Sequence, residues 1–310
     1  MDNGKISYIN NNNFGRGLLG GGVNAFDDNV LYYDLFDNQY ENNNLIVAGS
    51  EKYNFLKNSL KTHKNIYAGD FKAILFNTRG NNTFLPLDDE SENNAEIIDI
   101  DIFSPIYLNP FSLLTDYDLF NYNTSFLFYM LIDFLYIFVP DRDKITTVME
   151  KVVKRTISIA LRQCYVSYGK DLSVEHIAVY LSHHSSDEIT GMVENISLFV
   201  SKLGNFLLGR PDIRLKFDKQ FTDIRFRHDI FDDYKHKVYL YKTSVSCILI
   251  SAMFIHACNY VYKDKNKNSK TLLCVDSSRK VIDVCADVNQ FIETASRNFK
   301  SYGAGLLLLQ

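Results

Sequence analysis

The chain of 310 residues is 46% hydrophobic and 23% charged, which excludes a disordered protein and suits one large α/β domain with an insertion. Its net charge of −4 excludes binding to nucleic acid through a generally basic surface. The five cysteines are scattered without a Cys-x-x-Cys pair, and the start of the chain shows no signal peptide, so we expect reduced thiols and a cytoplasmic protein.

The first third of the chain predicts short strands, turns and one helix. Residues 15–24 are rich in glycine and predict tight turns rather than a regular element, whereas residues 30–36 favour a strand. A short apolar strand at 45–48 ends at Gly49, and a helical pattern follows it as far as Leu60. Strand, glycine and helix follow one another in phosphate-binding loops in this order.

The middle of the chain predicts further strands and then a series of helices. Residues 66–76 suggest a pair of strands, and residues 97–103 alternate apolar and acidic side chains, as a strand exposed on one face does. From about 118 to 210 the pattern is helical, and Gly169 ends one helix.

The last third predicts three more strands. Residues 210–229 form a short alternating segment, and residues 271–276 form a buried strand that ends in Asp276. A helix at 284–302 leads to a final apolar strand that closes in Gln310. We expect this last strand to lie at an open edge of the sheet, which either another chain completes or a shortened gene product leaves open.

Two apolar segments have to be weighed as membrane spans. Residues 124–140 are few for a span and include Asp133, and residues 243–262 have the length of a span but carry several polar side chains. Because a buried helix of a large α/β core has the same composition, we interpret both as core helices and expect membrane contact by association rather than by spanning.

Basic and aromatic side chains are interleaved in the 210–229 segment. This pattern suits a surface for single-stranded nucleic acid, but it is also typical of a strand with one solvated face, and nearby aspartates dilute the charge. We therefore do not expect direct contact with nucleic acid. The side chains concerned are Arg214, Lys216, Lys219, Arg225, Arg227, Phe217, Phe221 and Phe226.

The segment 271–310 resembles the Walker B strand, following helix and glutamine motif of the TraC/TraE-type conjugative-transfer (type IV secretion) ATPases. The residues that stand where that pattern expects them are Lys300, Tyr302, Gly303, Gly305 and Gln310. The resemblance extends to the lead-in of the phosphate loop, to an Asn-Pro-Phe motif at 109–111 and to the helical middle, so it covers nearly the whole chain.

This resemblance implies an α/β fold with a RecA-like P-loop NTPase core: a mainly parallel sheet flanked by helices. The core covers residues 45–310 after a turn and β-hairpin lead-in at 1–44. A large helical insertion occupies about 115–210, and no strands follow Gln310.

The phosphate-loop motif itself is degraded. It requires Gly-x-x-x-x-Gly-Lys-[Ser/Thr], in which glycines let backbone N–H groups surround the phosphates, the lysine neutralises charge and the hydroxyl holds Mg²⁺. Counted from Gly49, its last three positions are residues 54–56, and in a second alignment they are residues 52–54. Neither alignment supplies the motif. We name Gly49, Ser50, Lys52 and Asn54 as a degenerate phosphate loop.

The Walker B motif is half kept. Asp276 can bind Mg²⁺, although it can equally cap the next helix. Ser277 stands at the position of the family's water-polarising Glu and cannot accept a proton at neutral pH, and Gln310 stands at the glutamine motif.

The sequence therefore predicts a degenerate homologue of the transfer motor, with weak or absent ATP hydrolysis and a structural or regulatory place in the machine. Two alternatives stay open: an active ATPase with an atypical site, and a non-nucleotide interaction protein on an α/β scaffold. The resemblance implies secretion or conjugation subunits as partners, a homo- or hetero-oligomer, a place at the inner face of the cell membrane, and ATP with Mg²⁺ as doubtful cofactors.

Overall fold

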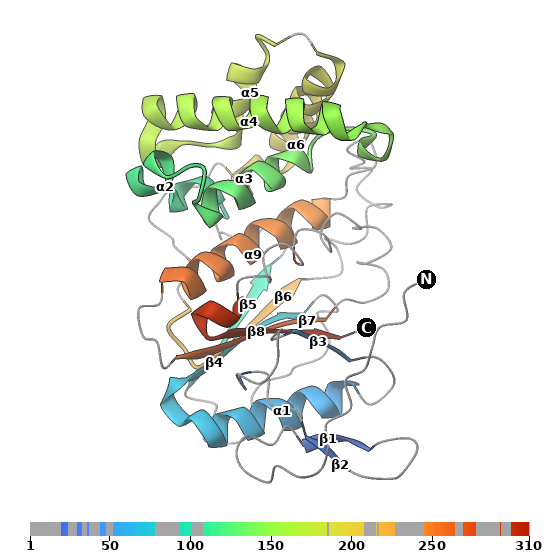
Figure 1. Ribbon diagram of the computed structural model, residues 1–310, viewed down its shortest axis with the longest axis vertical. Helices are drawn as coiled ribbons and strands as arrows, with labels where there is room; N and C mark the ends of the chain where they lie inside the picture. Colours follow the sequence, from blue (N-terminus) through green and yellow to red (C-terminus); the bar gives the residue numbers. More distant parts are fainter. Residues whose placement is uncertain are drawn as a thin grey trace.

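The computed structural model describes the chain over residues 20–23, 30–32, 36, 44–47, 52–77, 94–100, 108–184, 186–207, 215, 217–226, 245–263, 269–276, 292 and 299–309. Statements about structure below refer to these residues. They build a parallel β-sheet with helices on both faces and a layer of helices stacked above (Figure 1).

The main sheet has six strands in the order β3-β8-β7-β4-β6-β5, and every pairing between them is parallel. A parallel sheet is buried on both faces, which explains the continuous apolar runs that its strands carry. The predicted parallel α/β sheet is thereby confirmed. The strands are β3 (Asn44–Val47), β4 (Phe71–Asn77), β5 (Ala95–Ile100), β6 (Phe221–Phe226), β7 (Lys270–Asp276) and β8 (Ala304–Leu309).

Two strand predictions near the end of the chain are corrected by this order. The final strand β8 lies between β3 and β7, so it is an interior strand and not an open edge. Strand β6 has no solvated face, because Thr222 and Asp223 are as fully buried as the phenylalanines beside them. The polar side chains of β6 predict a solvated face, but the strand is covered on both sides.

Helix α1 (Lys52–Tyr67) covers one face of the sheet. Leu56, Leu60, His63 and Tyr67 follow at steps of four, three and four residues and therefore share one helical face, which packs on Phe71 and its neighbours. The predicted strand pair at 66–76 is wrong for this reason. Its first residues complete α1, the turn η1 (Ala68–Asp70) follows, and only β4 is a strand.

A small hairpin, β1 (Gly20–Val23) with β2 (Val30–Tyr32), lies beside α1. The predicted tight turns at 15–24 are corrected by it, since residues 20–23 pair as an antiparallel strand. Glycine weakens a strand without forbidding it, and pairing with β2 outweighs the local preference for turns.

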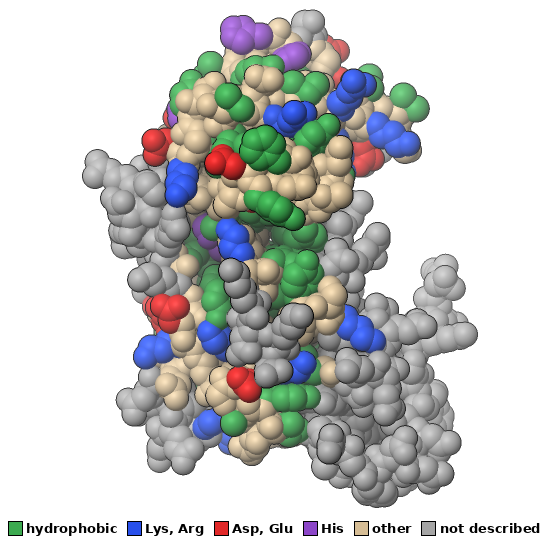
Figure 2. Space-filling model, turned by 60° about the vertical axis from the view of Figure 1, so that its left-hand side comes forward, with side chains coloured by type: hydrophobic (Ala, Val, Ile, Leu, Met, Phe, Trp, Pro, Cys, Tyr) green, Lys and Arg blue, Asp and Glu red, His purple; other side chains and the backbone are tan. Residues whose placement is uncertain are grey.

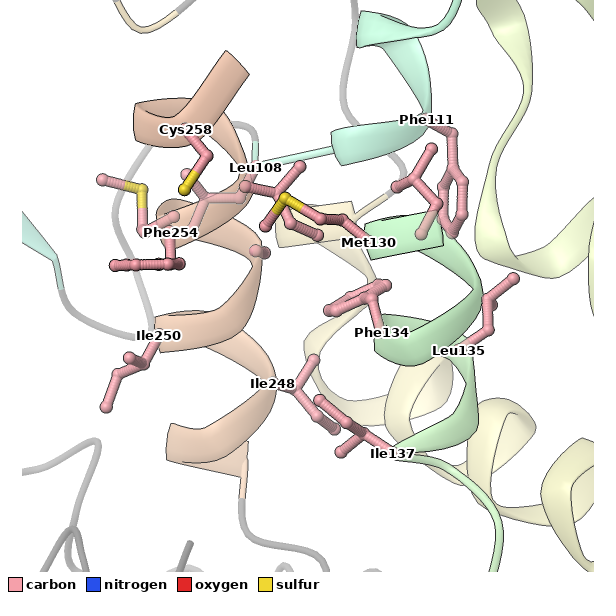
Figure 3. Packing of buried hydrophobic residues seen from close by; sticks show 14 of the residues in the cluster. Leu108, Phe111, Met130, Phe134, Leu135, Ile137, Ile248, Ile250, Phe254 and Cys258 are labelled. Atoms are coloured by element: carbon pink, nitrogen blue, oxygen red, sulfur yellow. The ribbon is translucent and has the colours of Figure 1, made fainter. Parts of the chain in front are cut away.

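Helix α9 (Val245–Lys263) covers the opposite face of the sheet and also contacts helix α3 (Phe126–Tyr136). Figure 3 shows Met130 and Phe134 of α3 turned toward α9, with Phe254 and Ile250 on the other side of α9. Phe254 reaches the sheet, where its ring lies 5.7 Å from that of Phe76. The predictions of core helices are confirmed, and no helix in the described segments is long and apolar enough to cross a membrane.

The remaining helices form the upper layer in Figure 1, between β5 and β6 in the chain. Gly169 ends α4 with φ 55°, as predicted, and Asn195 ties α6 to the end of α3 by donating to the carbonyl of Phe138 at 2.8 Å. Asn109 of the Asn-Pro-Phe motif caps the turn at 110–113 and donates to Leu172 O at 2.8 Å. The helices are α2 (Asp116–Phe120), α4 (Thr147–Tyr168), α5 (Val174–Leu181) and α6 (Asp187–Leu207).

Candidate functional site

The candidate site lies at the carboxyl ends of the parallel strands. Ligands of open α/β sheets bind at this edge, because loops and helix N-termini converge there. Strand β7 ends in Asp276 and β4 ends in Asn77, and these two residues are direct partners in the ladder. Both side chains are buried, Asp276 being 2% exposed.

Tyr53 brings α1 into contact with this edge. Its hydroxyl lies 3.0 Å from Asp276 Oδ2 and 3.3 Å from Oδ1, so the phenol donates a hydrogen bond to the carboxylate. Tyr53 is the second residue of α1, and α1 begins just after β3 in the chain. The contact therefore joins the start of the helix that follows the predicted phosphate loop to the end of the predicted Walker B strand.

The sequence-predicted site residues are only partly brought together. Asp276 lies at the predicted strand end, and Asn54 lies on the first turn of α1 with an exposed side chain. Lys52 is the first residue of α1, and its side chain lies outside the described residues. Gly49, Ser50, Ser277 and Gln310 also lie outside them, so their roles stay predictions.

Tyr53 is the site residue that sequence reasoning missed. In the second alignment of the phosphate-loop motif it stands at the lysine position, but a phenol does not neutralise phosphate charge and so gave no signal. Tyr53 could have been found only as a hydrogen-bond partner at a helix start for Asp276 at a strand end. That pairing becomes visible only when the sheet order is known.

Two of the described residues, Tyr53 and Asp276, bear on the binding of a Mg²⁺–nucleotide complex. Mg²⁺ prefers hard oxygen ligands in an octahedron, and a P-loop site offers it a hydroxyl from the first helical turn. Here the hydroxyl of Tyr53 in the first turn of α1 donates to Asp276, the carboxylate of the predicted Walker B strand, and residues 48–51 lie outside the described part of the chain. No cluster of three His, Cys, Asp or Glu side chains able to hold a metal occurs among the described residues.

A second polar pair lies on β6, farther along the same edge. Asp223 and Arg225 are two residues apart and therefore share a face of the strand, and Arg225 Nε donates to Asp223 Oδ2 at 3.0 Å. Arg225 is the ladder partner of both Asn77 and Asp99. Because Asp223 is completely buried and bonded to this guanidinium, the pair is part of the sheet interior.

Arg225 belongs to the basic and aromatic segment 210–229, whose pattern also suits a nucleic-acid surface. Arg225 is 13% exposed, and Phe217, Phe221 and Phe226 are buried in the core. Of that segment's basic residues, Lys219 lies on the described surface, whereas Arg214, Lys216 and Arg227 lie outside the described residues. The described part therefore offers no aromatic stacking platform there.

A shallow pocket of about 570 Å³ opens at the opposite edge of the sheet, where β4 begins. Lys64, Lys72, Asp218 and Gln220 contribute to its lining, and Phe71 lies at its side. Lys72 is already held, since it donates to Phe217 O at 3.3 Å and contacts the hydroxyl of Tyr260. The lining of this pocket mixes basic, acidic and amide side chains and does not point to one kind of ligand. We therefore place the candidate site at the edge of the sheet that contains Asp276.

The three cysteines whose side chains the structure describes are core residues. Cys164, Cys258 and Cys274 are free and buried. Burial raises the pKa of all three thiols, that of Cys164 to about 11, so none of them is a reactive thiolate at neutral pH.

Comparison with solved structures identifies the fold. The chain is similar to VirB4 of Thermoanaerobacter pseudethanolicus, with a TM-score of 0.54 and 13% identity over 84% of this chain and 92% of that one. It also matches the plasmid coupling protein TrwB, whose structure contains the GTP analogue GDPNP, with a TM-score of 0.47 and 13% identity over 86% of this chain and 63% of that one. The sequence matches no protein-family model and no curated protein. At this identity the likeness to VirB4 establishes the α/β fold, with its parallel sheet flanked by helices, and the fold alone.

Proposed function

We propose that this protein is a component of a type IV secretion or conjugative-transfer machine that has the fold of the machine's motor ATPase but hydrolyses ATP weakly or not at all. Two independent observations support the relationship. The order of motifs in the sequence resembles the conjugative ATPases, and the fold matches VirB4 over 84% of the chain. The proposed partners are other subunits of the same machine, at the inner face of the cell membrane.

The hydrogen bond from Tyr53 to Asp276 carries the inactive-site part of the proposal. A carboxylate that serves Mg²⁺ must present an oxygen to the metal or to one of its waters. The phenol oxygen lies 3.0 Å from Oδ2 and 3.3 Å from Oδ1 of the buried Asp276, so its hydroxyl competes with a metal or a metal-bound water for this carboxylate. Loss of a catalytic group of this kind typically lowers the rate by roughly 10² to 10⁴.

Phosphate release from ATP with Mg²⁺ tests this proposal. The wild-type chain and the Asp276→Asn variant are expected to release phosphate at the same rate as buffer. Tyr53→Phe removes the hydroxyl and keeps the ring, and it is the matched variant for the phenol. Turnover by the wild type that Asp276→Asn abolishes would instead support an active motor with an atypical site.

The machine context needs its own experiment. A tagged full chain expressed in its native host is expected to recover secretion or conjugation subunits. A variant with the same tag and an unfolded core, such as Phe254→Asp, controls for binding to the tag. If folded protein recovers no such subunit and binds no nucleotide, the interaction-protein alternative takes the place of this proposal.

A further inference from the structure

The outward face of α4 carries a stripe of apolar side chains that are exposed to solvent. Val148, Val152, Ile159 and Val166 are 74%, 54%, 42% and 80% exposed. They are separated by four, seven and seven residues, which places them within about 40° of one another around the helix axis. Exposed apolar side chains that align on one side of a helix are candidates for contact with a partner. Figure 2 shows hydrophobic and basic side chains side by side on the upper, helical part of the molecule.

A row of cations runs along one side of this stripe. Lys151, Arg155 and Arg162 are exposed and follow at steps of four and seven residues, so they lie next to the apolar side chains on the same flank. Among the described residues, none of the three forms an ion pair with a carboxylate. The guanidinium of Arg162 lies over the ring of Tyr122 at 4.1 Å, which helps to hold it in place.

The stability of α4 does not depend on this outward face. The opposite face is buried against the other helices through Val153, Ile157, Leu161 and Cys164. The fourth cation of the helix, Lys154, turns away from the stripe and bonds to Asp133 of α3 and to Glu150, each at 2.9 Å. Glu150 is the only acidic residue of α4, and it pairs with Lys154. Helix α4 therefore supplies no carboxylate to neutralise Lys151, Arg155 and Arg162.

We propose that the outward face of α4 docks an amphipathic helix of a partner protein whose apolar seam is flanked by carboxylates. Val152, Ile159 and Val166 follow at steps of seven, as one of the two seam positions of a heptad does, and the second position carries Arg155 and Arg162. The three unpaired cations beside it select acidic residues at the flanking positions of the partner helix. The stripe spans about 40°, which suits the narrow seam of a helix–helix contact and not the large apolar face of a helix that lies in a membrane interface. This proposal is independent of the nucleotide site.

The test measures binding of two synthetic helices to the full chain by fluorescence anisotropy at low salt. Both peptides have four heptads with leucine at the seam, and they carry either Glu or Lys at the flanking positions. The Glu peptide is expected to bind at least roughly tenfold more tightly than the Lys peptide. Val152→Asp combined with Ile159→Asp is expected to abolish binding of both peptides, since it removes the seam at exposed positions.

Charge reversal supplies the decisive comparison. Arg155→Glu with Arg162→Glu is expected to reverse the preference, so that the Lys peptide binds better. Lys57→Glu with Lys61→Glu makes the same change of charge at exposed positions of α1 and is expected to leave the preference unchanged. Equal binding of the two peptides, or no reversal, would overturn the proposal.

Two further measurements identify another occupant of the face. Light scattering of the chain alone reports self-association, and cosedimentation with phosphatidylcholine vesicles that contain phosphatidylglycerol reports lipid binding. If the α4 variants abolish either of these while the peptides show no preference, a second copy or a membrane occupies the face and the acidic-helix proposal is wrong.

Discussion

The buried histidine of α9 should make the stability of the protein depend on pH. His256 is 7% exposed within the helix that separates the sheet from the helical layer. Burial lowers its pKa to about 4 from 6.5, against a smaller opposing effect of a hydrogen bond with the backbone of Leu108. The folded protein therefore keeps this imidazole neutral at pH values where the unfolded chain protonates it.

The direction and size of the effect follow from this difference in pKa. Above pH 6.5 neither state binds the proton and the histidine makes no pH-dependent contribution. As the pH falls below 6.5, the unfolded state gains a proton that the folded state does not, so the free energy of unfolding decreases until the pH reaches about 4. The decrease amounts to about 2 kcal/mol at about pH 5 and to about 3 kcal/mol when complete.

Urea unfolding at about pH 7.5 and about pH 5 measures this contribution. Carboxylates also titrate in this range, so the informative quantity is the pH-dependent loss of stability in the wild type minus that in His256→Leu. This difference is expected to be about 2 kcal/mol. His183→Gln removes an exposed histidine and serves as the matched control. Equal pH dependence in the wild type and His256→Leu would refute the reasoning.

A methyl group at any of three glycines should lower the stability of the fold, and thermal or urea unfolding of single alanine variants tests all three. Gly303→Ala is expected to cost about 2 kcal/mol or more, because φ is 67° and the new Cβ would lie 2.6 Å from the backbone oxygen of Ser269. Gly169→Ala, with φ 55° and open space around it, should cost only about 1 kcal/mol, and an equal cost at both sites would remove the steric argument. Gly191→Ala on α6 would place its Cβ 2.6 Å from Cγ of Pro140. We expect this contact to destabilise the protein by about 1 kcal/mol, although alanine favours the helix more than glycine does. A gain in stability would show that the proline ring moves aside.

Much of the fold could be predicted from the sequence, because its strands and helices carry strong periodic signals. The apolar run before Asp276 and the final leucines are parallel strands, and residues 245–263 form a core helix as expected. The likeness to VirB4 confirms the α/β fold that the family resemblance implied.

The errors in the fold occurred where tertiary contacts override local preference. Glycines 20–22 pair in a hairpin, and Tyr67 belongs to α1 because its ring packs with Phe36 and His63 rather than in a strand. The interior position of β8 depends on which strands are its neighbours, and a linear sequence does not contain that information.

The candidate site was less predictable than the fold. The strand end at Asp276 was identified, since an apolar run followed by a carboxylate is a local pattern. The phenol that contacts it is 223 positions away in the chain, and only the sheet order brings the two together. The buried bond between Asp223 and Arg225 was hidden for a related reason, because alternating charge on a strand reads as solvent exposure.

We propose above that a fold similar to that of VirB4 persists here without a working nucleotide site. Isothermal titration of the full chain with ATP and Mg²⁺ tests it most directly, with Asp276→Asn as the reference for heat that does not come from the site. We expect no saturable binding at micromolar ATP and the same heat from both proteins. Micromolar binding by the wild type that Asp276→Asn loses, together with measurable phosphate release, would contradict the claim.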